Sequence, residues 1–121
     1  MVLVVDDDAS VRKALRRLFH ATGRNVETFA SAAEFLAYDL PPDAGCLVLD
    51  ICMPGISGLD LQKQLAMRNP DLPVVVITGH GDDEVRQRAL EGGAIAILDK
   101  PFDDQSLLDA VELAMGRKRS S

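Results

Sequence analysis

Three carboxylates, a hydroxyl and an amine each follow an apolar run of the sequence, and together they could bind a divalent cation and accept a phosphoryl group. They are Asp6, Asp7, Asp50, Thr78 and Lys100. Close carboxylates repel one another, and a hard cation such as Mg²⁺ relieves that repulsion while it also binds water and phosphate oxygens. A carboxylate beside the ion can act as a nucleophile, and a hydroxyl and an ammonium suit the remaining phosphoryl oxygens.

Asp50 is the candidate nucleophile because of its place in the sequence. It ends the apolar run 46–49, and the turn-forming pair Pro54-Gly55 follows soon after. A short apolar run bounded by turn residues predicts a strand buried on both faces. Asp50 would then lie at the carboxyl end of this strand, where open α/β sheets bind their ligands.

The other candidate residues also follow predicted strands. Apolar runs alternate five times with helical patterns, and the expected strands lie near residues 2–5, 25–29, 46–50, 74–77 and 94–98. This alternation predicts a parallel sheet with right-handed crossovers and helices on both faces, in the strand order 2-1-3-4-5. The mixed polarity of the second run suits an edge strand, whereas the other four are expected to be fully buried. Four strands would thus bring the candidate residues to one edge of the sheet.

Helix signals separate the strands. Asp8 is the expected N-cap of a first helix that ends near Gly23, Ser31 and Glu34 fit a capping box, and a last helix is expected from about 103 to 115. The polar face of the first helix carries four cations that we expect to be solvated: Arg12, Lys13, Arg16 and Arg17.

Size and composition set further bounds. A chain of 121 residues fits one domain, and its net charge of −6 argues against nucleic-acid binding by the domain itself. No apolar run approaches transmembrane length, and Met1 leads into apolar residues without a basic segment, so we expect a cytoplasmic protein without a membrane contact. Cys46 and Cys52 would bracket one strand about 20 Å apart, too far for a disulfide.

Four sequence motifs identify a family resemblance. They are Val5-Asp6-Asp7-Asp8, Leu49-Asp50-Ile51-Cys52-Met53-Pro54, Ile77-Thr78-Gly79-His80-Gly81 and Lys100-Pro101-Phe102. Over almost its whole length the chain resembles the receiver domain of two-component response regulators. Its sequence around Thr78 and Lys100 is most similar to the FixJ-type branch. The resemblance implies a single flavodoxin-like (CheY-like) (βα)5 domain over 1–116, with 117–121 as the start of a linker or tail.

The resemblance also implies roles for individual residues. Asp50 would accept a phosphoryl group from a phosphohistidine of a sensor histidine kinase. Asp7 and Asp50 would bind Mg²⁺ directly, Asp6 would act largely through water, and the backbone carbonyl of Cys52 would complete the protein ligands. The domain would be a signalling module that catalyses only its own phosphorylation and dephosphorylation.

Further implied roles concern the switch that follows phosphorylation. Thr78 would shift toward the phosphoryl group, and Lys100 would bridge to a phosphoryl oxygen or to Asp50. The Lys100–Pro101 peptide bond is expected to be cis. The family usually has an aromatic residue where this chain has Ile97, so we hypothesise that switching depends on the loop after Thr78 and on repacking around Ile97.

The rim of the pocket and the partners complete these expectations. Cys52, Gly79 and His80 would flank the phosphoryl group and influence its lifetime. The resemblance implies a phosphorylation-dependent homodimer through the fourth helix, fifth strand and fifth helix, around 86–109. It also implies control of transcription, with DNA bound only through an output domain that this sequence does not include.

Two other functions are compatible with parts of this pattern. A Mg²⁺-dependent phosphohydrolase with an aspartate nucleophile would place a second aspartate two residues after Asp50, where this chain has Cys52. A pseudo-receiver that only binds partners would be expected to lack one of the four charged residues of the pocket, Asp6, Asp7, Asp50 or Lys100, and all four are present.

Overall fold

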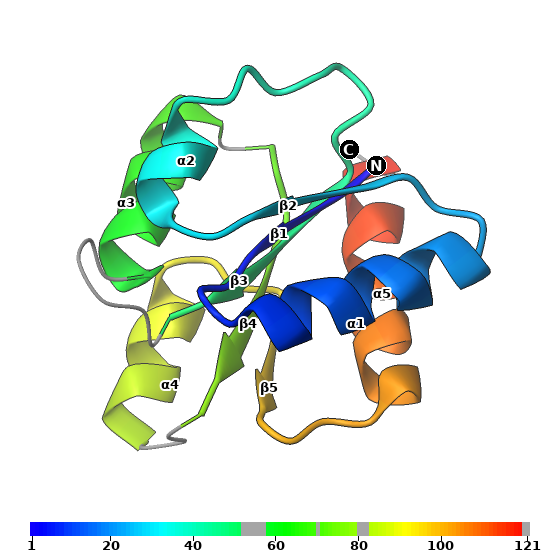
Figure 1. The fold of residues 1–121 in the computed structure, drawn as a ribbon. Helices are drawn as coiled ribbons and strands as arrows, with labels where there is room; N and C mark the ends of the chain where they lie inside the picture. The colour runs from blue at the N-terminus through cyan, green and yellow to red at the C-terminus, as the bar shows by residue number, and fades with distance from the viewer. Residues whose placement is uncertain (52–57, 70, 80–82, 120–121) are drawn as a thin grey trace.

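Strands and helices alternate along the whole chain (Figure 1). The computed structural model describes residues 1–51, 58–69, 71–79 and 83–119. The elements are β1 (Val2–Val5), α1 (Ala9–Ala21), β2 (Val26–Phe29), α2 (Ala32–Leu36), β3 (Cys46–Asp50), α3 (Gly58–Arg68), β4 (Val74–Thr78), α4 (Asp83–Glu91), β5 (Ala96–Asp99) and α5 (Asp104–Arg119).

The strands form one parallel sheet in the order β2-β1-β3-β4-β5, which confirms the predicted topology. Alternate residues of β1 enter different cores, because successive side chains of a strand point to opposite faces. Leu3 packs with residues of α2, α3 and α4, whereas Val4 packs with residues of α1 and α5. Helices therefore cover both faces, and all strands end at the same edge (Figure 1).

The prediction that four strands are fully buried is wrong for β5. Residues 96–98 are half-buried and Asp99 is exposed. The strand order leaves β5 at an edge, paired only with β4, so one of its flanks has no neighbouring strand. Its apolar sequence resembles that of the central strands because both of its faces are still covered by helices.

Local signals place the helix ends. The Asp8 side chain accepts a hydrogen bond from the Ser10 amide at the start of α1, as expected of an N-cap. At α2, Ser31 Oγ accepts from the Glu34 amide, and Glu34 Oε2 accepts from the Ala30 amide, one residue before the usual capping-box partner.

The last helix differs from the prediction at its carboxyl end. It continues to Arg119, beyond the expected end near residue 115. Of its apolar residues, Leu107 and Val111 are buried, whereas Leu108 and Met115 are half-buried.

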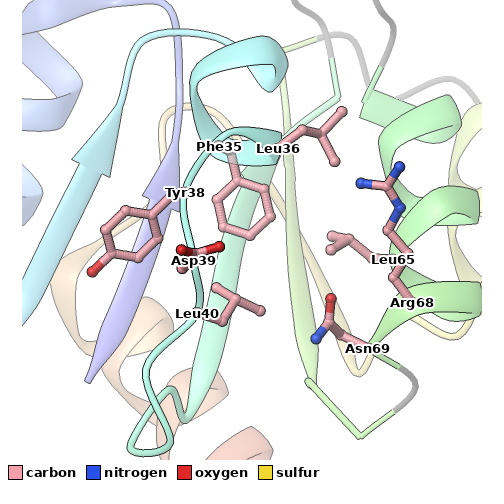
Figure 2. Close-up of a pocket in the computed structure, with 8 residues that line it drawn as sticks. All are labelled: Phe35, Leu36, Tyr38, Asp39, Leu40, Leu65, Arg68 and Asn69. Carbon is pink, nitrogen blue, oxygen red and sulfur yellow. The ribbon is translucent and has the colours of Figure 1, made fainter.

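A groove of about 340 Å³ lies between α2 with its following loop and the carboxyl end of α3 (Figure 2). Its lining residues are Phe35, Leu36, Tyr38, Asp39, Leu40, Leu65, Arg68 and Asn69. Helices of a parallel α/β fold run back against the strands, so this end of α3 lies away from the edge where the strands end. None of the predicted site residues lines the groove.

Candidate acidic phosphoacceptor site

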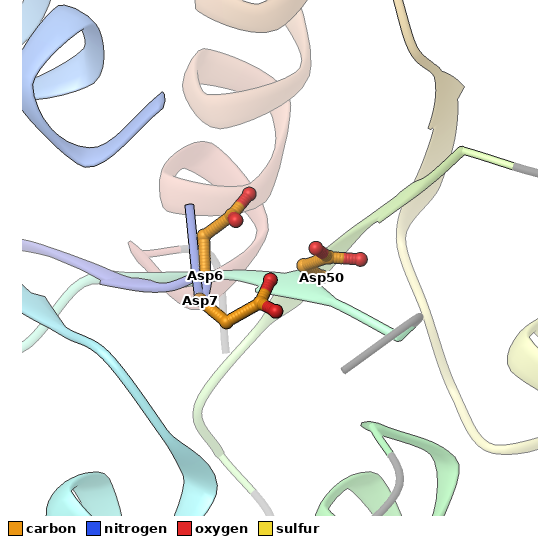
Figure 3. Close-up of side chains that lie close together, drawn as sticks. All are labelled: Asp6, Asp7 and Asp50. Atoms are coloured by element: carbon orange, nitrogen blue, oxygen red, sulfur yellow. The ribbon is translucent and has the colours of Figure 1, made fainter. Parts of the chain in front are cut away.

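The three predicted carboxylates gather where β1 and β3 end (Figure 3). One carboxylate oxygen from each of Asp6, Asp7 and Asp50 lies within 4.8 Å of the other two. Asp6 is 0% exposed and Asp50 is 2% exposed, whereas Asp7 is exposed. The cluster thus joins two buried acids to one that solvent reaches.

Backbone hydrogen bonds fix the turn that carries Asp6 and Asp7. The Asp6 amide donates to Phe29 O across 3.1 Å, which continues the pairing of β1 with β2. Asp6 Oδ1 accepts from the Asp8 amide across 2.9 Å, and Asp8 in turn caps α1. The end of β1 and the start of α1 are therefore held by the same acidic residues.

Lys100 inserts its ammonium between the two buried acids. Its Nζ lies 3.0 Å from Asp6 Oδ2 and 3.2 Å from Asp50 Oδ2. The Lys100 amide donates to Thr78 O across 2.8 Å, so the segment after β5 is tied to the end of β4. The Lys100–Pro101 peptide bond is cis, the geometry that the family resemblance implied.

The environment shifts two pKa values in this cluster. Burial raises the pKa of Asp6, the charge of Asp50 adds to that effect, and the hydrogen bonds from the Asp8 amide and Lys100 only partly oppose it. For Lys100, burial lowers the pKa, but hydrogen bonds and charges of Asp6 and Asp50 outweigh it, so the pKa is raised. Lys100 therefore stays an ammonium at neutral pH and shares one positive charge between Asp6 and Asp50.

Thr78 and Ile97 lie on the neighbouring strands. Thr78 ends β4 and is fully buried, and β4 pairs with β3 so that Ile77 lies opposite Asp50. Ile97 of β5 lies opposite Val76 of β4. Its side chain is half-buried and packs against the core on the face of the sheet that α2, α3 and α4 cover. Gly79 is exposed directly after Thr78. Cys52 and His80 lie outside the described residues.

Arg12 is a site neighbour that the sequence analysis missed. Its helical position predicts a solvated side chain, but the side chain is half-buried and its Nη1 donates to the Asp6 carbonyl across 2.8 Å. Helical periodicity places Arg12 on the polar side of α1. The contact between the Arg12 side chain and the Asp6 carbonyl depends on how close α1 lies to the end of β1, which periodicity does not show. Arg16 also has a partner, because its Nη2 donates to Thr28 Oγ1.

The donor set fits a hard divalent cation. Carboxylate oxygens are the ligands that Mg²⁺ prefers, and it commonly keeps waters beside one or two carboxylates. Here three carboxylates from the ends of two strands lie close enough to share one ion, and one lysine does not balance their charge. The residues therefore suit Mg²⁺ chemically.

Comparison with known proteins identifies the family. The model of the response regulator receiver domain matches residues 2–112. The chain belongs to this family. Nodulation protein W of Bradyrhizobium diazoefficiens is 50% identical to this receiver domain over 119 residues, which are 98% of the chain and 52% of that protein. Transcriptional regulatory protein FixJ of Azorhizobium caulinodans is 46% identical over 116 residues, covering 96% of the chain and 55% of that protein.

Solved structures show the same fold. The response regulator StyR is 49% identical to this receiver domain, with a TM-score of 0.90 over 98% of the chain and 60% of that structure. The structure titled FixJ-N is 38% identical, with a TM-score of 0.84 over 95% of the chain and 92% of that structure. These similarities confirm the predicted CheY-like fold and the FixJ-like character of the sequence.

The receiver domain spans about half the length of the first curated relatives it matches. Several relatives are named as transcriptional regulators or response regulators. In the described part of the chain, no helix combines the length and apolar character needed to cross a membrane.

Proposed function

We propose that this receiver domain accepts a phosphoryl group on Asp50 from a phosphohistidine of a sensor histidine kinase, with Mg²⁺ as cofactor. The observation that carries the proposal is the setting of Asp50. Its carboxylate ends β3, lies with Asp6 and Asp7 in a cluster that suits a cation, and has the Lys100 ammonium at 3.2 Å. A nucleophile between a cation site and an ammonium matches the needs of phosphoryl transfer, which depends on positioning and charge neutralisation.

The protein residues divide the chemistry among them. A carboxylate oxygen of Asp50 would attack phosphorus while the bond from phosphorus to the histidine nitrogen breaks. The bonding electron pair stays on that nitrogen. Asp7, Asp50 and the Cys52 carbonyl would hold Mg²⁺, with Asp6 acting through water, and the ion would offset the charge of the carboxylates and phosphoryl oxygens. Lys100 and Thr78 would bind phosphoryl oxygens of the product.

The switch is proposed to differ from the aromatic form common in the family. Ile97 is half-buried and β-branched, and such a side chain is stiff at χ1. We therefore expect phosphorylation to move the loop after Thr78 and to repack the side chains around Ile97. Structures with and without a phosphoryl mimic test this mechanism, and an unmoved loop and α4 would contradict it.

Three rim positions are proposed to set the lifetime of the phosphoryl group. Gly79 directly follows Thr78, and Cys52 and His80 stand two residues after Asp50 and Thr78, where water would approach the acyl phosphate. Substitution of Cys52 or His80 should change the rate of phosphate loss without changing the site of phosphorylation.

The larger assembly is also a proposal. We infer a cytoplasmic transcription regulator in which phosphorylation favours a homodimer through α4, β5 and α5, while a separate output domain binds DNA. Leu90 of α4 is an exposed apolar side chain on this surface. Size-exclusion chromatography before and after phosphorylation tests the dimer, with Asp50→Asn as control. A phosphorylated chain that remains monomeric would contradict it.

Intact-mass measurement tests the acceptor directly. The chain would be incubated with Mg²⁺ and a small-molecule phosphodonor, beside Asp50→Asn and a sample that contains a chelator. We expect one added phosphoryl group on the unmodified chain and none in the two controls. Phosphate release measured in the same tube identifies rapid turnover where no adduct accumulates. Neither adduct nor release, or an adduct on Asp50→Asn, would overturn the proposal.

A further inference from the structure

Arg12 links the first helix to the backbone beside the acidic cluster. Its Nη1 donates to the carbonyl oxygen of Asp6 across 2.8 Å. The side chain is half-buried, whereas Arg17, five residues later on the same helix, is exposed. A hydrogen bond from a charged guanidinium is stronger than a neutral one and has a fixed geometry. Arg12 thus combines partial burial with a specific contact to the backbone, whereas the side chain of Arg17 is exposed to solvent.

The contact acts on the peptide that carries Asp7. The carbonyl of Asp6, the amide of Asp7 and the Cα of Asp7 lie in one plane, because the peptide bond is planar. A donor that fixes the direction of the Asp6 carbonyl therefore also fixes the position of the Asp7 Cα, from which the side chain extends. Asp7 is the exposed member of the carboxylate cluster, and burial does not hold it in place.

Among the described residues, the other hydrogen bonds of this turn involve groups other than the Asp6 carbonyl. The Asp6 amide is bound to Phe29 O, the Asp8 amide to Asp6 Oδ1, and the Arg12 amide to Asp8 O. These bonds hold the amide and side chain of Asp6 and both ends of Asp8. The guanidinium of Arg12 adds the restraint on the peptide between Asp6 and Asp7.

We propose that Arg12 is a positioning residue for the metal site, holding the Asp6–Asp7 peptide so that the Asp7 carboxylate faces Asp50. The inference rests on the proposed Mg²⁺ site. Groups that hydrogen-bond to metal ligands and orient them commonly weaken metal binding by roughly 10- to 100-fold when they are removed. Here the orienting group would be a cation that acts on the backbone of a ligand.

The sign of the effect separates positioning from simple electrostatics. A positive charge near an acidic site repels a second cation, so loss of the Arg12 charge alone should strengthen Mg²⁺ binding. Loss of the hydrogen bond should weaken it, because Asp7 would sample orientations that do not reach the ion. The weakening should persist at high salt, which screens charge effects but does not restore the bond.

Calorimetric titration of Mg²⁺ into the unphosphorylated chain tests this prediction. Arg12→Met keeps much of the apolar stem and removes the donor, and Arg17→Met removes the same charge from an exposed position on the same helix. We expect Arg12→Met to bind Mg²⁺ roughly tenfold more weakly than the unmodified chain at low and high salt. Arg17→Met should bind as tightly as the unmodified chain or slightly more tightly.

Arg12→Lys provides the conservative comparison. Lysine retains the charge and a donor but lacks the planar fork, so it should recover part of the lost affinity. Thermal melts confirm that each variant is folded. If Arg12→Met does not fold, an affinity of Arg12→Lys between the unmodified value and a tenfold loss supports the proposal, and an unchanged affinity contradicts it.

Two outcomes overturn the inference for different reasons. Equal or tighter Mg²⁺ binding by folded Arg12→Met would show that Arg12 does not position the site, while the proposed metal site would stand. Failure of the unmodified chain to bind Mg²⁺ would remove the proposed metal site together with the role of Arg12.

Discussion

The ammonium of Lys100 lies 3.0 Å from Oδ2 of Asp6, although the two residues stand at opposite ends of the sequence. Asp6 is fully buried, and the side chain of Lys100 is 26% exposed. The ion pair therefore joins the buried carboxylate of Asp6 to the ammonium of Lys100, which solvent partly reaches. Lys100 also contacts Asp50, so one positive charge is shared between two acids.

Asp6→Asn is expected to stabilise the metal-free fold at neutral pH. Burial, helped by the charge of Asp50, raises the pKa of Asp6 above its ordinary value of 3.8. A raised carboxyl pKa contributes stability that is fully present below the ordinary value and is lost as pH rises through the folded pKa. The ionised acid therefore weakens the fold at pH 7, and the neutral amide removes that cost.

Thermal melts with a chelator present measure this effect. Asp6→Asn should melt above the unmodified chain at pH 7, and the difference should shrink as the pH falls toward 3.8. Asp71→Asn is the control because it removes an exposed carboxylate. A lower melting temperature for Asp6→Asn at pH 7 would show that its pairing with Lys100 outweighs its burial.

Lys100→Met is expected to destabilise the metal-free domain. The change leaves Asp6 and Asp50 without their shared ammonium, and loss of a hydrogen bond to a buried charged group costs about 1–3 kcal/mol. Mg²⁺ should restore more stability to this variant than to the unmodified chain, since the ion then supplies the missing positive charge.

Urea unfolding with and without Mg²⁺ checks the role of Lys100. Lys63→Met, at an exposed position of α3, should unfold near the unmodified midpoint in both conditions. A Lys100→Met midpoint equal to that of the unmodified chain without Mg²⁺ would contradict the pairing as a source of stability.

The main parts of the site could be predicted from the sequence because parallel strands all end at one edge. Asp6 and Asp50 directly follow apolar runs, so the topology alone brings them together. The partial exposure of β5 does not follow from its composition, because its residues are as apolar as those of a central strand. It follows instead from the predicted strand order, which already leaves one flank of this strand without a neighbour.

The contacts of long polar side chains also could not be predicted from the sequence. Arg12 lies on the polar face by helical period, and its reach to Asp6 O depends on how α1 meets β1. Gln62 is a polar residue next to the buried Leu61, yet it is itself only 2% exposed. Its burial depends on the packing of α3 against α4, which no local pattern describes.

Cys46 is expected to be unreactive in the folded domain. It is fully buried in β3, and burial raises the pKa of its thiol to about 12. At pH 8 only roughly one thiol in ten thousand would be ionised, and the thiolate is the reactive form. Labelling of Cys52→Ser, which retains Cys46, should therefore be slow until denaturant unfolds the chain. Rapid labelling under native conditions would contradict the burial of Cys46.

Gly92 and Gly93 are expected to resist substitution for different reasons. A Cβ at Gly92 would lie 2.8 Å from Cδ of the buried Gln62, whose Nε2 donates to Ala89 O across 2.8 Å. Gly93 has a φ of 96° and open space around its Cα. Alanine at Gly92 must displace a buried amide, whereas alanine at Gly93 must adopt a strained backbone.

A double-mutant cycle separates the two mechanisms. Gly92→Ala should cost about 1–3 kcal/mol of unfolding free energy by breaking the amide hydrogen bond, and much less after Gln62→Ala has removed the obstruction. Gly93→Ala should cost about 1–2 kcal/mol in both backgrounds, because its strain does not involve Gln62. Urea unfolding of the three single and two double variants gives both coupling energies. An equal cost of Gly92→Ala with and without Gln62 would show that the amide does not limit the residue at position 92.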